Sequence, residues 1–120
     1  MPPCHIAAVM IYVPAPAEGL AWYEKAFPSA TRERLEEQEF EYLRVGDIRL
    51  EVVQADEKVS PGPRGTVVYW NVANLKESLL ALQTIGATLY RGPMNIENGQ
   101  SMCQVQDPWG NCFGLRGARA

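Results

Sequence analysis

The chain has 120 residues, of which 47% are apolar and 21% are charged, and its net charge is −3. This composition is typical of one folded domain with an ordinary core, and it excludes an intrinsically disordered chain. The acidic balance and the lack of a basic tract argue against nucleic acid and anionic membranes as partners.

The compartment can also be predicted from the sequence. The apolar stretches are too short to cross a bilayer, and residues 1–5 lack the basic start and apolar run of a secretion signal. Three cysteines, an odd number without close pairing, fit a reducing environment. We therefore expect a cytoplasmic protein with no membrane partner. His5 is the only histidine, which excludes any site built on two or more histidines.

The first half of the chain predicts a strand, a helix and three further strands. Leu20, Tyr23 and Phe27 follow helical spacing, and Pro28 stops the helix. Gly46-Asp47 predicts a turn between the last two strands. The predicted elements are a strand over 6–13, a helix over 17–27, and strands over 31–35, 40–45 and 48–54.

The second half repeats this order after a linker predicted over residues 55–65, which is rich in Pro, Gly and charged residues. Asn74 and Glu77 form a capping-box pattern that starts a helix, and Gly86 ends that helix. The remaining predicted elements are strands over 66–73, 87–90, 102–106 and 111–116, with a loop over 91–100.

The two halves form a faint internal repeat. Val13 matches Val72 and Leu20 matches Leu79, both at an offset of 59 residues. The predicted fold class is therefore α+β, a single domain of two βαβββ units at about 5–54 and 66–117.

The final hairpin resembles a known family signature. Asp107-Pro108-Trp109-Gly110-Asn111 and the residues up to Leu115 are similar to the DPxGNxxxL motif of the vicinal oxygen chelate superfamily. That superfamily contains glyoxalases, bleomycin-resistance proteins and extradiol dioxygenases. The segments 11–27 and 67–87 resemble the openings of its two units, so the resemblance covers nearly the whole chain. It implies a cup-shaped, partly open mixed barrel, with helices on the convex face and the site on the concave face.

The resemblance also implies where a metal would bind. In metal-using members, His, Gln or Glu ligands come from the first and fourth strands of each unit. The equivalent positions here are Ala8, Glu51, Val67 and Gly114, and only Glu51 has a donor side chain. We therefore expect no bound metal and no cofactor. His5 is three residues from Ala8 and so belongs to the opposite face, which favours a strand-start or surface residue over a ligand.

These four positions, taken as inward-facing, determine the faces of their strands. The opposite face then carries only apolar side chains, as expected under helices: Ala7, Val9, Ile11, Val13, Ile48, Leu50, Val52, Val68, Trp70, Val72, Phe113 and Leu115. The concave face combines aromatic and aliphatic area with a few polar groups, which is typical of a small-molecule site: Ile6, Met10, Tyr12, Arg49, Glu51, Val53, Tyr69, Asn71, Met102, Gln104, Gln106, Cys112 and Arg116.

Several of these concave residues are candidates for ligand binding. The predicted ligand-binding residues are Tyr12, Arg49, Tyr69, Asn71, Gln104 and Arg116. The two arginines suit an anionic group, and the neutral polar side chains suit orientation by hydrogen bonds. Glu51 beside Arg49 is the candidate general base, and the alternative is a solvated ion pair between these two. Cys112 has no histidine to activate it, which favours a packed thiol over a nucleophile.

Two functional hypotheses follow, together with a less favoured third. The first is a metal-free binding protein of the bleomycin-resistance type that holds a small organic ligand. The second is a glyoxalase-like lyase or isomerase that uses Glu51 as general base or metal ligand. The third is a module for stability or interaction without a ligand. Apolar strand edges and the resemblance lead us to expect a homodimer.

Overall fold

The computed structural model describes residues 6–36 and 39–119 of the chain. The chain divides into two units, Met1–Ser60 and Pro61–Ala120, and each is described by itself below. The boundary falls inside the segment 55–65, which the sequence predicts as a linker. His5, interpreted above as a strand-start or surface residue, lies outside the described residues.

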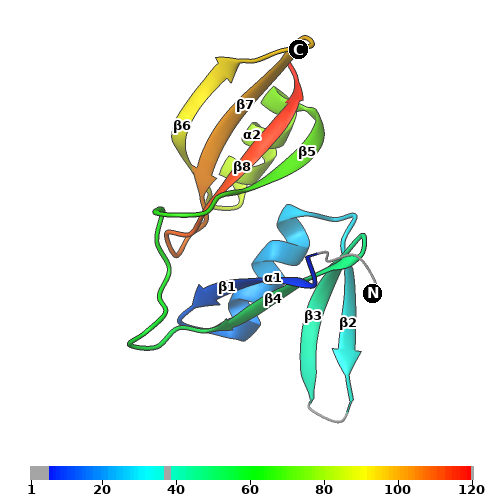
Figure 1. Ribbon diagram of the computed structural model, residues 1–120, viewed down its shortest axis with the longest axis vertical. Helices are drawn as coiled ribbons and strands as arrows, with labels where there is room; N and C mark the ends of the chain where they lie inside the picture. Colours follow the sequence, from blue (N-terminus) through cyan, green and yellow to red (C-terminus); the bar gives the residue numbers. More distant parts are fainter. Residues whose placement is uncertain (1–5, 37–38, 120) are drawn as a thin grey trace, which may run out of the picture. The chain divides into compact units, whose positions relative to one another are not determined.

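The first unit is a four-stranded mixed sheet with one helix packed on it (Figure 1). Its elements are β1 (Ala8–Val13), α1 (Pro16–Ala26), β2 (Thr31–Leu35), β3 (Phe40–Val45) and β4 (Ile48–Gln54). The strand order is β1-β4-β3-β2, with β1 parallel to β4 and the other pairs antiparallel. The predicted bounds of β2, β3 and β4 are confirmed.

Helix α1 lies close to strands β1 and β4 because of a glycine. It begins at Pro16, and Ala15 at the N-cap position makes no side-chain capping hydrogen bond. A Cβ atom at Gly19 would lie 2.8 Å from methyl groups of both Val13 and Val52. Only the missing side chain allows this approach, which helps to bury both valines beneath the helix.

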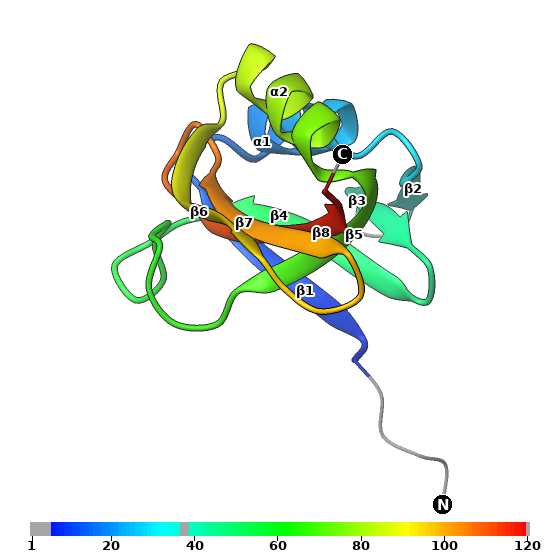
Figure 2. The same cartoon turned by 90° about the horizontal axis from the view of Figure 1, so that it is seen from above.

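The second unit has the same order of elements and the same topology. Its elements are β5 (Val68–Asn74), α2 (Leu75–Thr84), β6 (Thr88–Asn95), β7 (Gln100–Gln106) and β8 (Cys112–Ala118). The strand order is β5-β8-β7-β6, with β5 parallel to β8, and Figure 2 shows α2 lying over one face of this sheet. The predicted α+β fold of two βαβββ units is confirmed. Neither helix in residues 6–36 and 39–119 has the length and apolar character needed to cross a membrane.

The N-cap of α2 is the predicted one, but the helix covers less of strand β5 than the sequence led us to expect. The side chain of Asn74 accepts a hydrogen bond of 2.9 Å from the backbone N–H of Glu77, which confirms the predicted N-cap. Val68 was expected beneath the helix, yet it is 37% exposed. The ten residues of α2 span about 15 Å from Asn74. Val68 is at the far end of β5, about 20 Å from Asn74 along the strand. The helix is therefore too short to cover it.

Strand β6 is longer than predicted. The sequence favoured a short strand over 87–90 and a loop over 91–100, whereas β6 continues to Asn95. The register with β7 shifts between Leu89 and Arg91 and again between Arg91 and Met94, and these irregularities accommodate Gly92 and Pro93 within the strand. Gly92 has φ +85°, and a Cβ there would lie 3.0 Å from the carbonyl oxygen of Met102, so the position requires glycine.

The turn between β7 and β8 is organised by one buried carboxylate. Asp107 is 3% exposed, and its Oδ1 accepts backbone hydrogen bonds of 2.9 Å from Trp109 and Asn111. Its Oδ2 accepts a third hydrogen bond, 3.0 Å long, from the side-chain amide of Asn111. The turn pairs Gln106 with Cys112 and so determines the register of the two strands. The predicted Asp-Pro-Trp-Gly turn is confirmed.

Candidate functional site

In each unit one sheet face packs against the helix, and the other, here called the helix-free face, carries the predicted site residues. Because α1 contacts Val13 and Val52, alternate residues of β1 and β4 point away from it. The helix-free face of the first unit includes Met10, Tyr12, Tyr42, Arg44, Arg49 and Glu51. That of the second unit includes Tyr69, Asn71, Met102, Gln104, Cys112, Gly114 and Arg116.

The strand registers show which positions of the two units correspond under the internal repeat. The parallel pair of the first unit places Met10 beside Glu51, and that of the second unit places Tyr69 beside Gly114. Met10 and Tyr69 are separated by 59 residues, the offset of the sequence repeat. Glu51 and Gly114 therefore occupy equivalent positions on their fourth strands.

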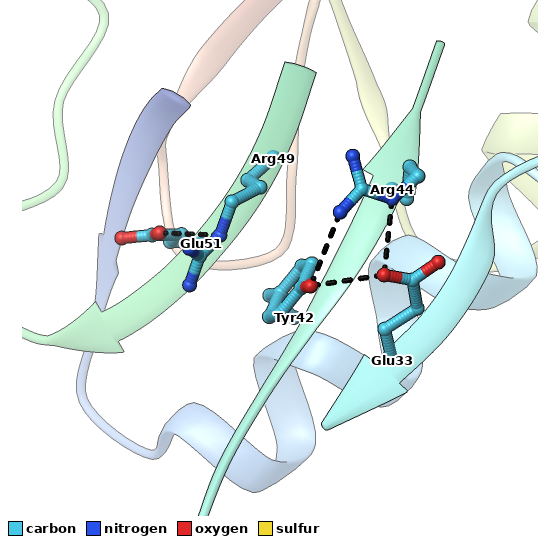
Figure 3. A network of polar contacts seen from close by, with 5 residues as sticks. All are labelled: Glu33, Tyr42, Arg44, Arg49 and Glu51. Atoms are coloured by element: carbon cyan, nitrogen blue, oxygen red, sulfur yellow. Dashed lines mark hydrogen bonds and ion pairs between the residues drawn. The ribbon is translucent and has the colours of Figure 1, made fainter. Parts of the chain in front are cut away.

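Arg49 and Glu51 form an ion pair on β4 (Figure 3). The Nε of Arg49 lies 3.1 Å from Oε2 of Glu51, whose side chain is only 11% exposed. This Nε is buried, yet within the described chain its N–H makes no aligned hydrogen bond, so charge attraction holds the pair. The guanidinium carbon of Arg49 lies 4.1 Å from the ring centroid of Tyr42, a cation–π contact. The side chain of Arg49 is 31% exposed, so the guanidinium is more accessible to solvent than the carboxylate.

Three further residues of this face form a polar network next to Arg49 (Figure 3). The hydroxyl of Tyr42 donates a hydrogen bond of 2.9 Å to Oε1 of Glu33, and the Nε of Arg44 donates one of 3.0 Å to the same oxygen. These two donors hold the pKa of Glu33 below its usual value. The network was not predicted. The turn at Gly46-Asp47 could have indicated part of it, because a two-residue turn places Arg44 opposite Arg49.

Tyr12 joins this face from the first strand. Tyr12 pairs with Val53, two residues along from the pair of Met10 and Glu51. Its hydroxyl contacts the Met10 sulfur at 3.8 Å. The first unit therefore brings Tyr12, Arg49 and Glu51 to one sheet face, as predicted from side-chain alternation.

In the second unit the ring of Tyr69 lies directly on the backbone of Gly114. A Cβ atom at Gly114 would overlap the Cδ2 and Cε2 atoms of that ring. The side-chain amide of Gln104 donates a hydrogen bond of 2.9 Å to the Tyr69 hydroxyl. The guanidinium carbon of Arg116 lies 4.9 Å from the ring centroid. Tyr69 thus contacts two further predicted residues, Gln104 and Arg116, and its ring lies on a glycine.

Asn71 and Cys112 lie at the margins of this group. Asn71 is exposed and pairs with Arg116 across β5 and β8. The thiol of Cys112 lies 3.8 Å from the side-chain oxygen of Gln104. Burial, together with the negative charge of Asp107, raises the pKa of the Cys112 thiol, so the reactive thiolate is disfavoured. This agrees with the interpretation of Cys112 as a packed thiol.

The residues present do not fit a metal site of the kind that the family resemblance implies. Ala8, Val67 and Gly114 offer no donor, and the Tyr69 ring fills the space in which a side chain at position 114 would lie. Glu51 is engaged by Arg49. Among residues 6–36 and 39–119, no three His, Cys, Asp or Glu side chains converge to hold a metal ion.

A hollow of about 260 Å³ lies elsewhere in the first unit, between α1 and the helix-covered side of its sheet. Its lining residues are Pro16, Ala17, Leu20, Arg32, Glu39, Phe40, Glu41 and Val52. None of the predicted site residues lines it. Arg32 within it is bound by Glu24 at 3.0 Å and Glu41 at 3.1 Å, so its charge is already compensated.

Comparison with known proteins gives one family match and several similar folds. Residues 5–115 match the family model described as Glyoxalase/Bleomycin resistance protein/Dioxygenase superfamily. A glyoxalase family protein from Bacillus cereus has a TM-score of 0.76 and 18% identity, with 100% of this chain and 97% of that chain covered. No curated protein matches the chain.

Two other solved structures have similar folds. A glyoxalase/bleomycin resistance protein/dioxygenase family enzyme from Burkholderia phytofirmans has a TM-score of 0.70 and 18% identity, covering 92% of this chain and 96% of its own. The genomically encoded fosfomycin resistance protein FosX from Listeria monocytogenes has a TM-score of 0.73 and 8% identity, covering 98% and 93%. At these identities the likeness concerns the fold alone.

The contact between Tyr69 and Gly114 predicts a coupled effect on stability. Gly114→Ala should lower the free energy of unfolding by about 1–3 kcal/mol, because the new methyl group collides with the ring. The same change in a Tyr69→Ala background should cost about 1 kcal/mol less, since the ring is absent. Urea unfolding measures both costs. Gly62→Ala is the control, because a Cβ there meets no atom within 4 Å. Equal costs of Gly114→Ala in the two backgrounds would contradict the contact.

The lowered pKa of Glu33 predicts a pH-dependent contribution to stability. The ionised carboxylate stabilises the folded state, fully above the unfolded pKa near 4.5, and this contribution is lost as the pH falls through the lower folded pKa. Urea unfolding from pH 7 to pH 3 should therefore show Glu33→Gln less stable than wild type at neutral pH, with the difference shrinking in acid. Glu57→Gln, at an exposed loop position, is the control. A difference that does not change with pH would refute this role of the charge.

Proposed function

This chain belongs to the glyoxalase/bleomycin resistance protein/dioxygenase superfamily, and on that basis we propose that it binds a small organic ligand without a divalent metal. The observation that supports this most strongly is the position of the Tyr69 ring on the bare backbone of Gly114. An aromatic surface lies where a side chain of the fourth strand would project. The chemistry available there is stacking and hydrogen bonding instead of metal coordination.

The proposed binding residues lie on the helix-free faces and are partly organised before a ligand arrives. In the second unit, the hydrogen bond between Gln104 and Tyr69 holds both side chains in one arrangement. A ligand that binds a pre-organised group loses less free energy to side-chain ordering. We propose that the binding residues are those predicted from the sequence: Tyr12, Arg49, Tyr69, Asn71, Gln104 and Arg116.

A second candidate function is supported by the condition of Glu51. The side chain of Glu51 is 11% exposed, and its carboxylate forms an ion pair with Arg49. The carboxylate accepts no hydrogen bond from the described residues. A carboxylate with unused acceptor positions can take a proton from a bound substrate. This supports glyoxalase-like lyase or isomerase chemistry, with Glu51 as the general base and Arg49 as a positive neighbour.

Nuclear magnetic resonance with a fragment set tests the proposal. Aromatic and aliphatic amides, alcohols and carboxylates would be titrated into ¹⁵N-labelled protein in the presence of EDTA. A fragment of about 14 heavy atoms at about 0.3 kcal/mol per atom should bind with a Kd of about 1 mM. Saturable shifts are expected at Tyr69, Gln104 and Gly114, and Tyr69→Ala should abolish them. Tyr90→Ala is the matched control, because Tyr90 is 49% exposed on β6 of the same unit.

The same titration separates the two candidate functions. Fragments that bind and stay chemically unchanged support a binding protein. Conversion of a fragment that stops in Glu51→Gln supports the catalytic candidate, and conversion that survives this change removes Glu51 from that role. The proposed function fails if no fragment gives a saturable shift on a helix-free face.

A further inference from the structure

The register of the second sheet arranges its helix-free face in two neighbouring rows that cross all four strands. The row of donors and aromatic area consists of Arg91 on β6, Gln104 on β7, Gly114 on β8 and Tyr69 on β5. The next row consists of Met94, Met102, Arg116 and Asn71 on the same strands. Two thioether side chains therefore lie beside a group of hydrogen-bond donors.

The positive charges of this face are not balanced by acidic residues on the same strands. None of the four strands of the second unit contains Asp or Glu. Arg116 is exposed, and it makes no ion pair with any described residue. In the first unit, by contrast, Arg44 is paired with Glu33 and Arg49 with Glu51. The uncompensated positive charge is noteworthy because the whole chain carries a net charge of −3.

The hydrogen bond within the group leaves a second donor available. The amide nitrogen of Gln104 donates to the Tyr69 hydroxyl, so that oxygen acts as acceptor in this bond. The hydroxyl proton of Tyr69 is then available to another acceptor. The side-chain oxygen of Gln104 faces the thiol of Cys112 at 3.8 Å, which favours this orientation of the amide. The guanidinium carbon of Arg116 lies 4.9 Å from the centroid of the same ring, so a charged donor lies over the ring that carries this hydroxyl.

We propose that this face binds the oxyanion group of an organic anion, a carboxylate or a phosphate monoester. Arg116 is the charged anchor, and the Tyr69 hydroxyl is the second donor to the oxyanion. Arg91, opposite Gln104 in the register, adds a second positive charge at the β6 side. Met102 and Met94 contact the apolar part of the ligand, a role that suits flexible thioether side chains. This inference rests on the proposed function and names the class of ligand for it.

The arrangement discriminates against the other classes of small ligand. An organic cation would be repelled by the two arginines, and no carboxylate on these strands offsets that repulsion. A neutral ligand would gain the hydroxyl hydrogen bond and the methionine contacts, but not the charge-assisted bond to Arg116. Of these classes, only an oxyanion can accept from both the Arg116 guanidinium and the Tyr69 hydroxyl and also gain from the positive charge.

Three probes of matched shape test this inference: benzoate, phenyl phosphate and neutral benzamide. Each would be titrated into ¹⁵N-labelled protein, with the side-chain amide of Gln104 and the Nε–H of Arg116 as reporters. At least one anion should bind about tenfold more tightly than benzamide, because a hydrogen bond to a charged group is stronger than a neutral one. Tighter binding of benzoate identifies a carboxylate ligand, and tighter binding of phenyl phosphate identifies a phosphate ligand.

Three variants decide whether Arg116 provides the preference. Arg116→Gln should remove the preference for the anions, and Arg116→Lys should retain part of it. Arg64→Gln removes the same charge from an exposed loop position of this unit and should change nothing. Because Arg116 is exposed, its replacement leaves the core intact, and the dispersion of the amide spectrum verifies folding.

Each contrary outcome has a distinct meaning. Benzamide binding as tightly as both anions would overturn the anion inference and leave small-molecule binding intact. An anion preference that survives in Arg116→Gln would overturn the assignment of the anchor. The absence of saturable shifts at Gln104 and Arg116 with all three probes would also overturn the inference, while the broader fragment titration decides the proposed function separately.

Discussion

The parallel pairing of the first and fourth strands in each unit determines which side chains share a sheet face. It places Met10 beside Glu51 in the first unit and Tyr69 beside Gly114 in the second. A slip of one residue would turn the apolar side chains that now pack under the helix to the opposite face, at a large cost in buried area. The register that builds the two cores is therefore the same register that assembles the polar and aromatic groups of the helix-free faces.

Within this common framework the two units have acquired different chemistry at equivalent positions. In the first unit a nearly buried carboxylate, Glu51, is neutralised by Arg49, which stacks on Tyr42. In the second unit the equivalent residue is Gly114, and an aromatic ring occupies the space above it. One face is thus a network of compensated charges. The other combines an aromatic ring, an ordered amide and an arginine that makes no ion pair with any described residue. Among the residues that the structure describes, neither face provides the converging donors that a divalent ion requires.

The fold was largely predictable because its signals are local. Alternating strands, the Asn74 cap and the turns at Gly46 and Asp107 act over a few residues, and the structure confirms them. The pairing of Arg49 with Glu51 also follows from alternation along one strand. The predicted extent of β6 was too short because Gly and Pro usually mark a loop. Only the pairing with β7 shows that an irregular register accommodates Gly92 and Pro93 within the strand. The contact of Tyr69 with Gly114 joins residues far apart in the chain, so no local pattern predicts it.

The metal content of the protein is the most direct test of whether an aromatic and hydrogen-bonding surface replaces metal coordination, as we propose. The chain would be produced in medium supplemented with zinc, manganese and iron, purified without chelator, and measured by inductively coupled plasma mass spectrometry. We expect every divalent metal to be far below stoichiometric, with no change in Glu51→Gln. One equivalent of a divalent metal per chain, lost in Glu51→Gln, would show that the protein coordinates a metal at Glu51 and would rule out metal-free binding.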